Sequence, residues 1–414
     1  MKTHRTRHIG AVAVVVMALA APATARADAV TDWHAYAGNA LVAARQSPTV
    51  ASLHMAMVQG AVYDAVNGID RGHRPYLVLP IAQPWDSPDA AAATAAYRVL
   101  LGIVPAQQPA LEPLYYASLA AVPDGASKEG GISAGEAAAA EMLAARTSDG
   151  RFGPFRFIAG SAPGTWRPDV PTFGSDPFAW VAHVTPFLIR DASQFRSDGP
   201  NALTSDEYAT EFAEVKAIGD RNSSTRTADQ TEQALFWGAE HGTPLLGRII
   251  RTIAANQGLS IAQEARLFAM ISLSGADASI SCWNDKAYWS FWRPVTAIRL
   301  ADTDGNPATE ADPAWEPLLA TPPFPDHPSG HSCASASIVA NLQNYFGTDK
   351  VAFSAFSNGS ATWRSYTRFS GMIKEIIDAR IYAGIHFRAA DEQGAIIGKK
   401  AAHWAEKYYF QPVG

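Results

Sequence analysis

Apolar and small residues recur along the chain in long runs that lack a two-residue alternation. Such runs cover residues 52–66, 90–103, 136–146, 229–237, 245–254 and 261–272. A long run without alternation favours a buried helix over a half-buried strand. Nowhere does the sequence alternate apolar and polar residues over a long stretch, as a half-buried strand would. The pattern therefore predicts an all-α protein.

Two irregular regions interrupt the predicted helices. Residues 147–200 carry many Gly, Pro and aromatic residues, and residues 302–327 contain six prolines together with several acids. Loops of this length in a compact protein are functional or lie between domains. We therefore predict an N-terminal helical domain at residues 28–200 and a C-terminal helical-bundle domain at residues 201–414.

The composition describes a globular protein with a large core. Of the 414 residues, 48% are hydrophobic and 17% are charged, which excludes a disordered chain. The formal net charge is -6, and nucleic-acid binding relies on an excess of Lys and Arg that neutralise phosphates. A nucleic-acid partner is therefore not expected, and any bound anion must be met by a local basic pocket.

The first 27 residues have the parts of a secretory signal peptide. A basic start precedes an apolar run at residues 9–21 and an A-x-A-like site at residues 25–27. The run is shorter than the roughly 20 residues of a membrane span. Cleavage after Ala27 would remove four basic residues and no acid, which takes the formal net charge from -6 to -10. We expect a secreted or periplasmic protein without a membrane anchor.

Export would allow a disulfide to form. The chain has two cysteines, Cys282 and Cys333. One bridge between them is the simplest prediction for an exported protein, and two buried free thiols are the alternative.

Two short motifs suggest chemistry but lack the local structure that it needs. Residues 131–135 match the G-x-S-x-G pattern of esterases, yet a polar turn and not a buried strand precedes them. Ser133 and Glu136 are instead predicted to form a capping box that opens a helix. His327 and His331 have a spacing suited to zinc, but Pro328 and Gly330 oppose a regular helix and no third ligand follows nearby.

Basic and polar groups suited to one oxyanion occur in three C-terminal segments. Lys286 and Arg293 are seven residues apart, which on one helix is about two turns and nearly the same face. Ser329 and Gly330 form a turn that leads into a helix, where a hydroxyl and free N–H groups favour an anion. Taken separately, an ordinary surface pair and an ordinary helix start would explain these two segments.

The third segment contains Arg380 and His386, with His331 of the second segment as a further imidazole. Six residues place Arg380 and His386 about 120° apart on a continuous helix. A break near Gly384 is therefore needed to aim both side chains at one point. On its own, His386 would be read as a core histidine.

In order, the three segments read K-x6-R-P, P-S-G-H and R-x5-H. This arrangement resembles the signature shared by vanadium-dependent haloperoxidases and type 2 phosphatidic acid phosphatases, which include bacterial class A acid phosphatases. Trp283, Phe324 and the length of the N-terminal half are similar to the haloperoxidase branch, especially its secreted bacterial members. The small acid phosphatases are much shorter chains.

The resemblance implies a fold, a cofactor and an activity. The fold would be an all-α pair of helical bundles, and the cofactor would be vanadate, or phosphate in the same pocket. His386 would bind vanadium, His331 would be the acid/base, and Trp283 and Phe324 would line the halide side. The enzyme would oxidise halide with hydrogen peroxide to hypohalous acid, which halogenates a small organic acceptor. The residues that would hold the oxygens of the anion are Lys286, Arg293, Ser329, Gly330 and Arg380.

The resemblance also leaves an alternative and a departure. Vanadate and phosphate are alike in shape and charge, so the same pocket fits an acid phosphatase with His386 as nucleophile and His331 as general acid. The family commonly has an Asp four residues after the metal-linked histidine, where this chain has Ala390. Asp391 or a backbone carbonyl would then orient His386. The family fold also implies that Cys282 and Cys333 lie within bonding reach.

Overall fold

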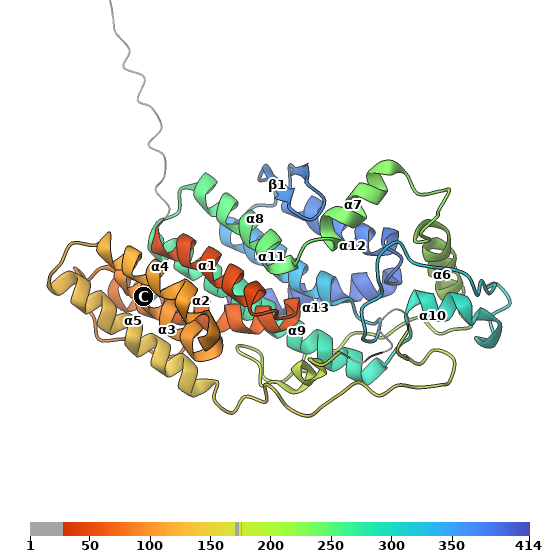
Figure 1. Cartoon of the computed structure of the whole chain (residues 1–414), viewed down its shortest axis with the longest axis horizontal. Coiled ribbons are helices and arrows are strands. Elements are labelled where there is room, and N and C mark those ends of the chain that lie inside the picture. Colours follow the sequence, from red (N-terminus) through yellow and green to blue (C-terminus); the bar gives the residue numbers. More distant parts are fainter. Residues whose placement is uncertain (1–27, 170–173, 175) are drawn as a thin grey trace, which may run out of the picture.

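The computed structural model describes residues 28–169, 174 and 176–414. Over these residues the regular secondary structure consists of α-helices, three short 3₁₀ helices and one small β-hairpin, joined by irregular segments (Figure 1). The expectation of an all-α, two-bundle fold is confirmed. The predicted signal peptide at residues 1–27 lies outside the described residues and stays a prediction.

The helices fall into an N-terminal group, which lies at the left of Figure 1, and a C-terminal group, which fills the middle and right of the view. The first group is α1 (Ala29–Ala43), α2 (Pro48–Asp70), α3 (Pro88–Ile103), α4 (Gln108–Ala120) and α5 (Ala126–Ala145), with η1 (Pro105–Gln107) between α3 and α4. The second is α6 (Asp206–Ile218), α7 (Ala228–Gly238), α8 (Gly242–Gln257), α9 (Ile261–Trp289), α10 (Pro294–Arg299), α11 (Gly330–Phe346), α12 (Phe369–Tyr382) and α13 (Arg388–Tyr408). The other 3₁₀ helices are η2 (Ala179–His183) and η3 (Ala301–Thr303).

Side-chain caps fix where several helices begin. The hydroxyls of Ser47 and Ser87 accept hydrogen bonds from backbone N–H groups in the first turns of α2 and α3. Thr227 and Ser260 form capping boxes at α7 and α9 with the glutamines three residues later. Each cap satisfies a backbone donor that lacks a helical partner, which explains why the predicted helical runs begin where they do.

The predicted start of the helix at residue 136 is wrong. Helix α5 begins at Ala126, so the Ser133–Glu136 pair lies inside the helix and does not cap it. The glycines of the G-x-S-x-G match have a packing role instead. A Cβ at Gly131 would lie 2.3 Å from the carbonyl oxygen of Ser87, and one at Gly135 would lie 2.5 Å from that of Ala91. The motif therefore lets α5 approach α3 closely.

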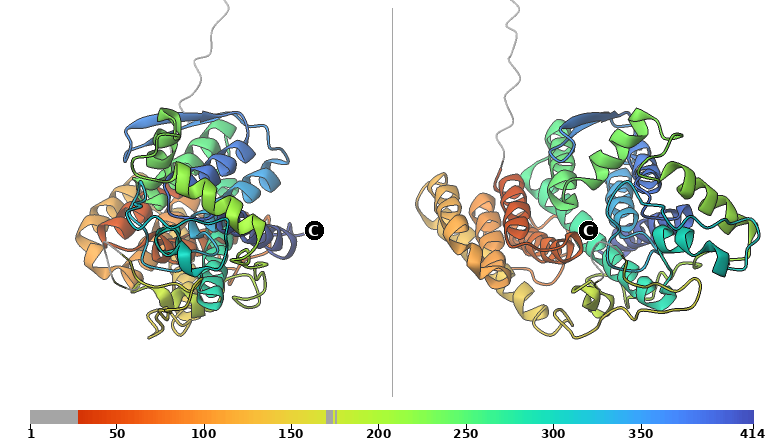
Figure 2. Two further views of the ribbon diagram at one scale, coloured as in Figure 1. Left: turned by 90° about the vertical axis from the view of Figure 1, so that its right-hand side faces the viewer. Right: turned by 45° about the vertical axis from the view of Figure 1, so that its right-hand side comes forward.

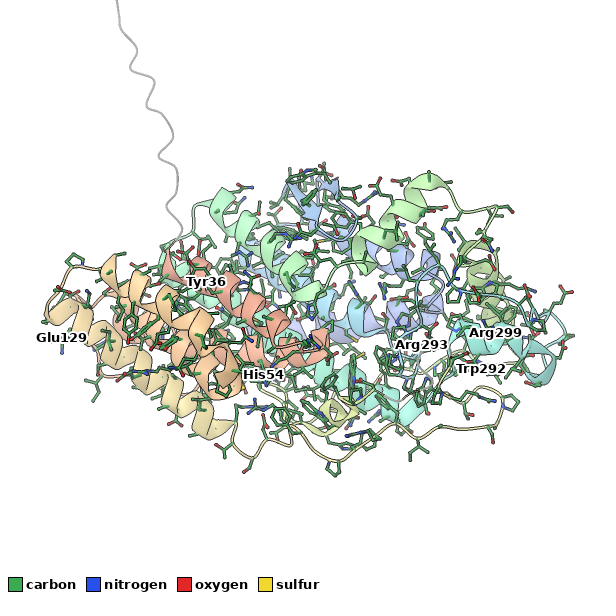
Figure 3. All side chains as sticks on the ribbon, viewed as in Figure 1. Tyr36, His54, Glu129, Trp292, Arg293 and Arg299 are labelled. Atoms are coloured by element: carbon green, nitrogen blue, oxygen red, sulfur yellow. The ribbon has the colours of Figure 1, made fainter. Side chains whose placement is uncertain are left out.

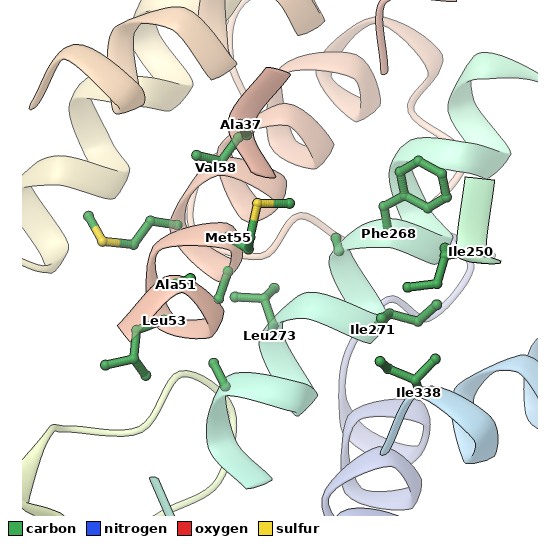
Figure 4. Close-up of a cluster of buried hydrophobic side chains, with 14 of the residues drawn as sticks. Ala37, Ala51, Leu53, Met55, Val58, Ile250, Phe268, Ile271, Leu273 and Ile338 are labelled. Carbon is green, nitrogen blue, oxygen red and sulfur yellow. The ribbon is translucent and has the colours of Figure 1, made fainter. Parts of the chain in front are cut away.

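Helix α9 is shared by the two groups of helices. It packs against α2 on the N-terminal side and against α11 and α13 on the C-terminal side, and the right-hand view of Figure 2 shows it between the two groups. Figure 4 shows Met55 of α2, Leu273 of α9 and Ile338 of α11 in one cluster of buried side chains. Because one apolar core spans both groups, α9 holds the C-terminal segments in a fixed place. The domain boundary near residue 200 stays a prediction.

The sequence pattern did not predict the hairpin formed by β1 (Phe353–Ser357) and β2 (Thr362–Tyr366). The strands are antiparallel, with Phe353 opposite Tyr366, and each has only five residues. Strands this short give little alternation to detect.

Among the described helices, none is long and apolar enough to cross a membrane.

The irregular region at residues 147–200 is anchored on α9 by buried carboxylates. The backbone N–H groups of residues 187–189 donate to Asp277, with N···O distances of 2.6, 2.7 and 2.9 Å. Further along, the backbone N–H of Ser197 donates to Asp285 over 2.7 Å, and Arg196 pairs with the same carboxylate. This loop thus runs along α9 as far as the turn that carries Lys286.

Candidate functional site

The three predicted segments meet at the C-terminal end of α9, the start of α11 and the turn between α12 and α13. Lys286 and Arg293 do not share a helix, contrary to the prediction. Helix α9 ends at Trp289, and Ser290 has the left-handed conformation, with φ 45° and ψ 42°. Arg293 instead precedes Pro294 at the start of α10, because the residue before a proline is disfavoured in helical conformation. Figure 3 shows Arg293 inside the C-terminal half.

The predicted break near Gly384 is confirmed. Helix α12 ends at Tyr382, and Gly384 has a φ of +76°. A Cβ at this position would lie 2.4 Å from the carbonyl oxygen of Gly219, so both the backbone conformation and the space require glycine. The break turns His386 back toward Arg293, whose Nη1 lies 3.1 Å from His386 Nε2.

Lys286 holds the loop before the P-S-G-H turn. Its ammonium group donates to the carbonyl oxygens of Pro325, Asp326 and Pro328, at 2.7, 3.0 and 2.6 Å. Lys286 is fully buried, and burial lowers its pKa to about 8. All three of its N–H groups thus donate to backbone carbonyl oxygens, and none is directed into the pocket. This differs from the predicted direct contact between Lys286 and an anion.

Two guanidinium groups keep buried donors at the site. Arg293 is 1% exposed; it donates from Nε to the carbonyl oxygen of Phe324 and from Nη1 to that of Ile385. Its Nη2, and the Nε of buried Arg380, have no hydrogen-bond partner within the described part of the chain. An unpaired buried donor costs about 1–3 kcal/mol, so these two groups indicate that the site is built to meet an acceptor.

The P-S-G-H turn adds a backbone donor and an imidazole. Gly330 is the first residue of α11, so its N–H has no helical acceptor. A Cβ at Gly330 would lie 2.6 Å from the Trp283 ring, so only glycine fits beside this ring. The Nε2 of His331 is buried and has no partner among the residues described. Burial, with a smaller effect of Arg380, lowers the pKa of His331 to about 3, so its imidazole is neutral.

Asp391 does not orient His386, contrary to the expectation. It accepts a hydrogen bond from the Ser332 hydroxyl over 2.7 Å, and burial raises its pKa to about 6. This contact fastens α13 to the start of α11. The Ser329 hydroxyl, which was predicted to face the anion, accepts from the backbone N–H of Ser332 and caps α11.

Asp326 contacts His386 in its place. Its Oδ1 lies 2.8 Å from His386 Nδ1 and 3.6 Å from Arg293 Nη1. Both Asp326 and His386 are buried, and burial raises the pKa of Asp326 well above its usual range. The only sequence signal for this role is an acid three residues before Ser329 in an otherwise apolar, proline-rich segment.

Trp283 and Phe324 form an aromatic wall beside the cations. Their ring centroids are 5.1 Å apart. The Phe324 ring lies 5.0 Å from Lys286 Nζ and 4.9 Å from Arg293 Cζ, within the range of cation–π attraction. Both aromatic residues line a cavity of about 500 Å³. The site residues that line this cavity are Gly330, His331, Arg380 and His386.

No zinc site forms around His327 and His331. The Nε2 of His327 lies 3.1 Å from the Ser197 hydroxyl. The described residues contain no group of three His, Cys, Asp or Glu side chains placed to hold a metal ion.

Cys282 and Cys333 are not bridged, so the predicted disulfide is wrong. Both thiols are free and buried. Cys282 Sγ donates to the carbonyl oxygen of Pro328 over 3.4 Å. Burial, reinforced by the neighbouring Cys282, raises the pKa of Cys333 well above its usual range. The two residues are neighbours as the family fold implied, but the thiols act as small buried side chains.

We expect reductant to leave the melting temperature unchanged. Two thiols per chain should react with a thiol reagent only after unfolding in guanidinium, because both are buried in the native state. Thiol titration with and without denaturant tests this. Unfolded protein that shows no reactive thiol before reduction would contradict the free-thiol structure.

Comparisons with known proteins agree with this arrangement. Residues 266–413 match the family model of the VCPO second helical-bundle domain. The vanadium chloroperoxidase of Curvularia inaequalis is 32% identical over 188 residues, which are 37% of this chain and 30% of that relative's length.

Two solved structures share the fold over most of both chains. The crystal structure described as that of the first bacterial vanadium-dependent iodoperoxidase superposes on this chain with a TM-score of 0.78 and 22% sequence identity. The match covers 93% of this chain and 96% of that one. A holo-type bacterial vanadium-dependent chloroperoxidase has a TM-score of 0.71 and 16% identity, covering 87% and 92%. The resemblance noted in the three segments is confirmed: residues 266–413 match the VCPO second helical-bundle domain, and the chain shares its fold with bacterial vanadium-dependent haloperoxidases.

Proposed function

We propose that the protein is a vanadate-dependent haloperoxidase, which converts halide, hydrogen peroxide and a proton to hypohalous acid and water. One observation carries the proposal. Within the part of the chain that the structure describes, Arg293 Nη2 and Arg380 Nε are buried without an acceptor, and they lie with the first N–H of α11, at Gly330, around His386. The names of the similar proteins support the choice of vanadate and halide.

These residues fit a tetrahedral oxyanion. Guanidinium groups match such anions with two parallel hydrogen bonds, and each charge-assisted hydrogen bond is worth about 1.5–3 kcal/mol. Lys286 adds a buried positive charge even though its protons are given to backbone carbonyls. We therefore assign the oxygens of vanadate to Arg293, Arg380 and the N–H of Gly330.

His386 is suited to bind vanadium. Burial and the nearby cations Arg293 and Lys286 keep its pKa well below the usual value, so the imidazole is neutral and retains a lone pair. Asp326 faces Nδ1, so we assign Nε2, which lies 3.1 Å from Arg293 Nη1, as the binding nitrogen. When bound, vanadate supplies a Lewis-acidic centre that activates hydrogen peroxide toward halide.

His331 serves the proton transfers. It is neutral, and its Nε2 has no protein partner in the described ranges. It lines the same cavity as His386 and Arg380. We assign it to take a proton from hydrogen peroxide and to return one to the oxygen that leaves as water. Trp283 and Phe324, next to the cations, form the side on which halide approaches.

The test is bromination of a phenolic dye by purified protein with bromide and peroxide, with and without orthovanadate. Hydrolysis of p-nitrophenyl phosphate without vanadate is measured in parallel. Bromination that depends on vanadate supports the proposal. Phosphatase turnover that vanadate inhibits, without bromination, would overturn it and assign the same residues to a phosphohydrolase.

Replacing Asp326 with alanine is expected to weaken vanadate binding by about 10–100-fold, the usual cost of losing the partner that orients a metal-bound histidine. Asp326→Asn should recover most of the affinity, because the amide keeps a polar group of the same shape beside His386 Nδ1. Equilibrium dialysis against vanadate measures both variants. An Asp326→Ala protein that folds and binds vanadate like the wild type would contradict this role.

A further inference from the structure

We propose that the cavity beside the oxyanion site binds a neutral phenol with an apolar substituent, and that this bound molecule is halogenated. The inference rests on the proposed function and names its organic acceptor. It concerns the part of the cavity that extends away from Trp283 and Phe324, between the two groups of helices.

Helices α9 and α11 form two walls that lead to the catalytic end. On α9, Ser272, Gly275 and Ser279 line the cavity and are followed by Trp283 at helical spacing. On α11, the lining residues follow His331 with the same periodicity and are Ala334, Ser335 and Ile338. A molecule lying along these faces would therefore have one end next to His331.

The remaining walls are mostly apolar. Met55 of α2 and Leu246 and Ile250 of α8 line the side that faces α9 and α11. The cavity volume of about 500 Å³ lies within the roughly 300–1,000 Å³ of typical small-molecule sites. The space is therefore large enough for a substituted ring and far larger than hydrogen peroxide or halide requires.

The charged groups along these walls are already paired, so the lining selects a neutral molecule. Both oxygens of Asp176 accept hydrogen bonds, from Phe178 N–H and from Trp283 Nε1. Arg248 pairs with both oxygens of Glu240, each at 2.7 Å. Among the described lining residues, Arg380 at the catalytic end is the one Arg or Lys.

Ser335 provides a polar contact for the ligand. Ser335 is fully buried, and its Oγ has no hydrogen-bond partner among the described residues. It lies one helical turn after His331 and lines the cavity. A hydroxyl can both donate and accept, so it fits the hydroxyl group of a phenol, whose electron-rich ring is the usual target of electrophilic halogenation.

The chemistry balances without another reactant. A ring carbon attacks the halogen of hypohalous acid, so a carbon–halogen bond forms and the halogen–oxygen bond breaks. The ring then loses a proton, which combines with the departing hydroxide as water. The residues of the cavity walls orient the ring and so determine which ring carbon is halogenated.

Gly275 offers a way to fill the cavity. A Cβ at this position meets no atom within 4 Å, although the residue is buried in the middle of α9. Gly275→Leu should project into the cavity without a clash, and Gly275→Ala is the matched control that fills little space. Helix propensity favours both over glycine, so neither substitution should unfold the chain; thermal melting checks this.

The experiment measures binding of 3-propylphenol to vanadate-free protein by calorimetry, and the isomer ratio of its bromination by the vanadate-loaded protein. We expect saturable binding that Gly275→Leu weakens at least about 10-fold and Gly275→Ala leaves nearly unchanged. Ser335→Ala should also weaken it, and cationic tyramine should bind poorly. Wild-type protein should give an isomer ratio different from that of free hypobromous acid, and Gly275→Leu should approach the free ratio.

Equal binding by wild type and Gly275→Leu, or isomer ratios identical to free hypobromous acid, would overturn the inference. Cavity-dependent phenol binding without any bromination would instead refute the proposed function, and with it halogenation of the bound phenol. The binding arm uses no vanadate, so the two failures are distinguishable.

Discussion

Replacing His386 with alanine is expected to abolish vanadate-dependent halide oxidation. It should also weaken vanadate binding by more than the roughly 10–100-fold typical of losing an outer partner, because the proposed bond to vanadium is itself removed. His386 is 2% exposed and lies between Arg293 and Asp326, so no other imidazole can take its place from solvent. Equilibrium dialysis and dye bromination measure the two effects.

The matched control is His403→Ala, which removes an exposed histidine of α13 away from the cavity lining. This variant should bind vanadate and brominate the dye like the wild type. If His386→Ala retained either property with its fold intact by circular dichroism, the assignment of His386 as the vanadium ligand would be wrong.

His331→Ala is expected to lower kcat by about 10²–10⁴-fold, the usual contribution of a positioned acid or base. Vanadate binding should be largely kept, because the anion is assigned to Arg293, Arg380 and Gly330. The contrast with His386→Ala separates proton transfer from metal binding. Steady-state bromination with saturating vanadate, together with the vanadate affinity of the same preparation, measures it.

Two results would contradict the role of His331. Unchanged kcat would exclude it from the proton transfers. A loss of vanadate affinity as large as that of His386→Ala would make it part of the anion site instead. His403→Ala again serves as the control for removal of a histidine.

The sequence predicted the helical fold because its apolar runs are long. The runs at residues 52–66 and 261–272 became α2 and the start of α9, with caps at Ser47 and Ser260. Five-residue strands left too little pattern to detect. The helix boundary at Ser290 was also not predictable from spacing, because a single left-handed residue broke the face that Lys286 and Arg293 were expected to share.

The motifs identified which residues gather at the site but not what each of them contacts. Lys286 and Ser329 lie there, yet Lys286 donates to backbone carbonyls and the Ser329 hydroxyl accepts from the N–H of Ser332. The contact with His386 that was expected of Asp391 is made by Asp326, which lies 60 positions before His386 in the sequence. Such partners are set by how α9, α11 and the α12–α13 turn pack together, and single-sequence spacing contains no information on that packing.

Vanadate binding to the purified protein is the most direct test of the oxyanion site. Equilibrium dialysis with orthovanadate, with and without excess phosphate, measures its stoichiometry and competition. We expect one bound vanadate per chain, which phosphate displaces and which Arg380→Ala and His386→Ala bind much more weakly. Binding that is absent, or that is indifferent to phosphate and to both substitutions, would contradict this expectation.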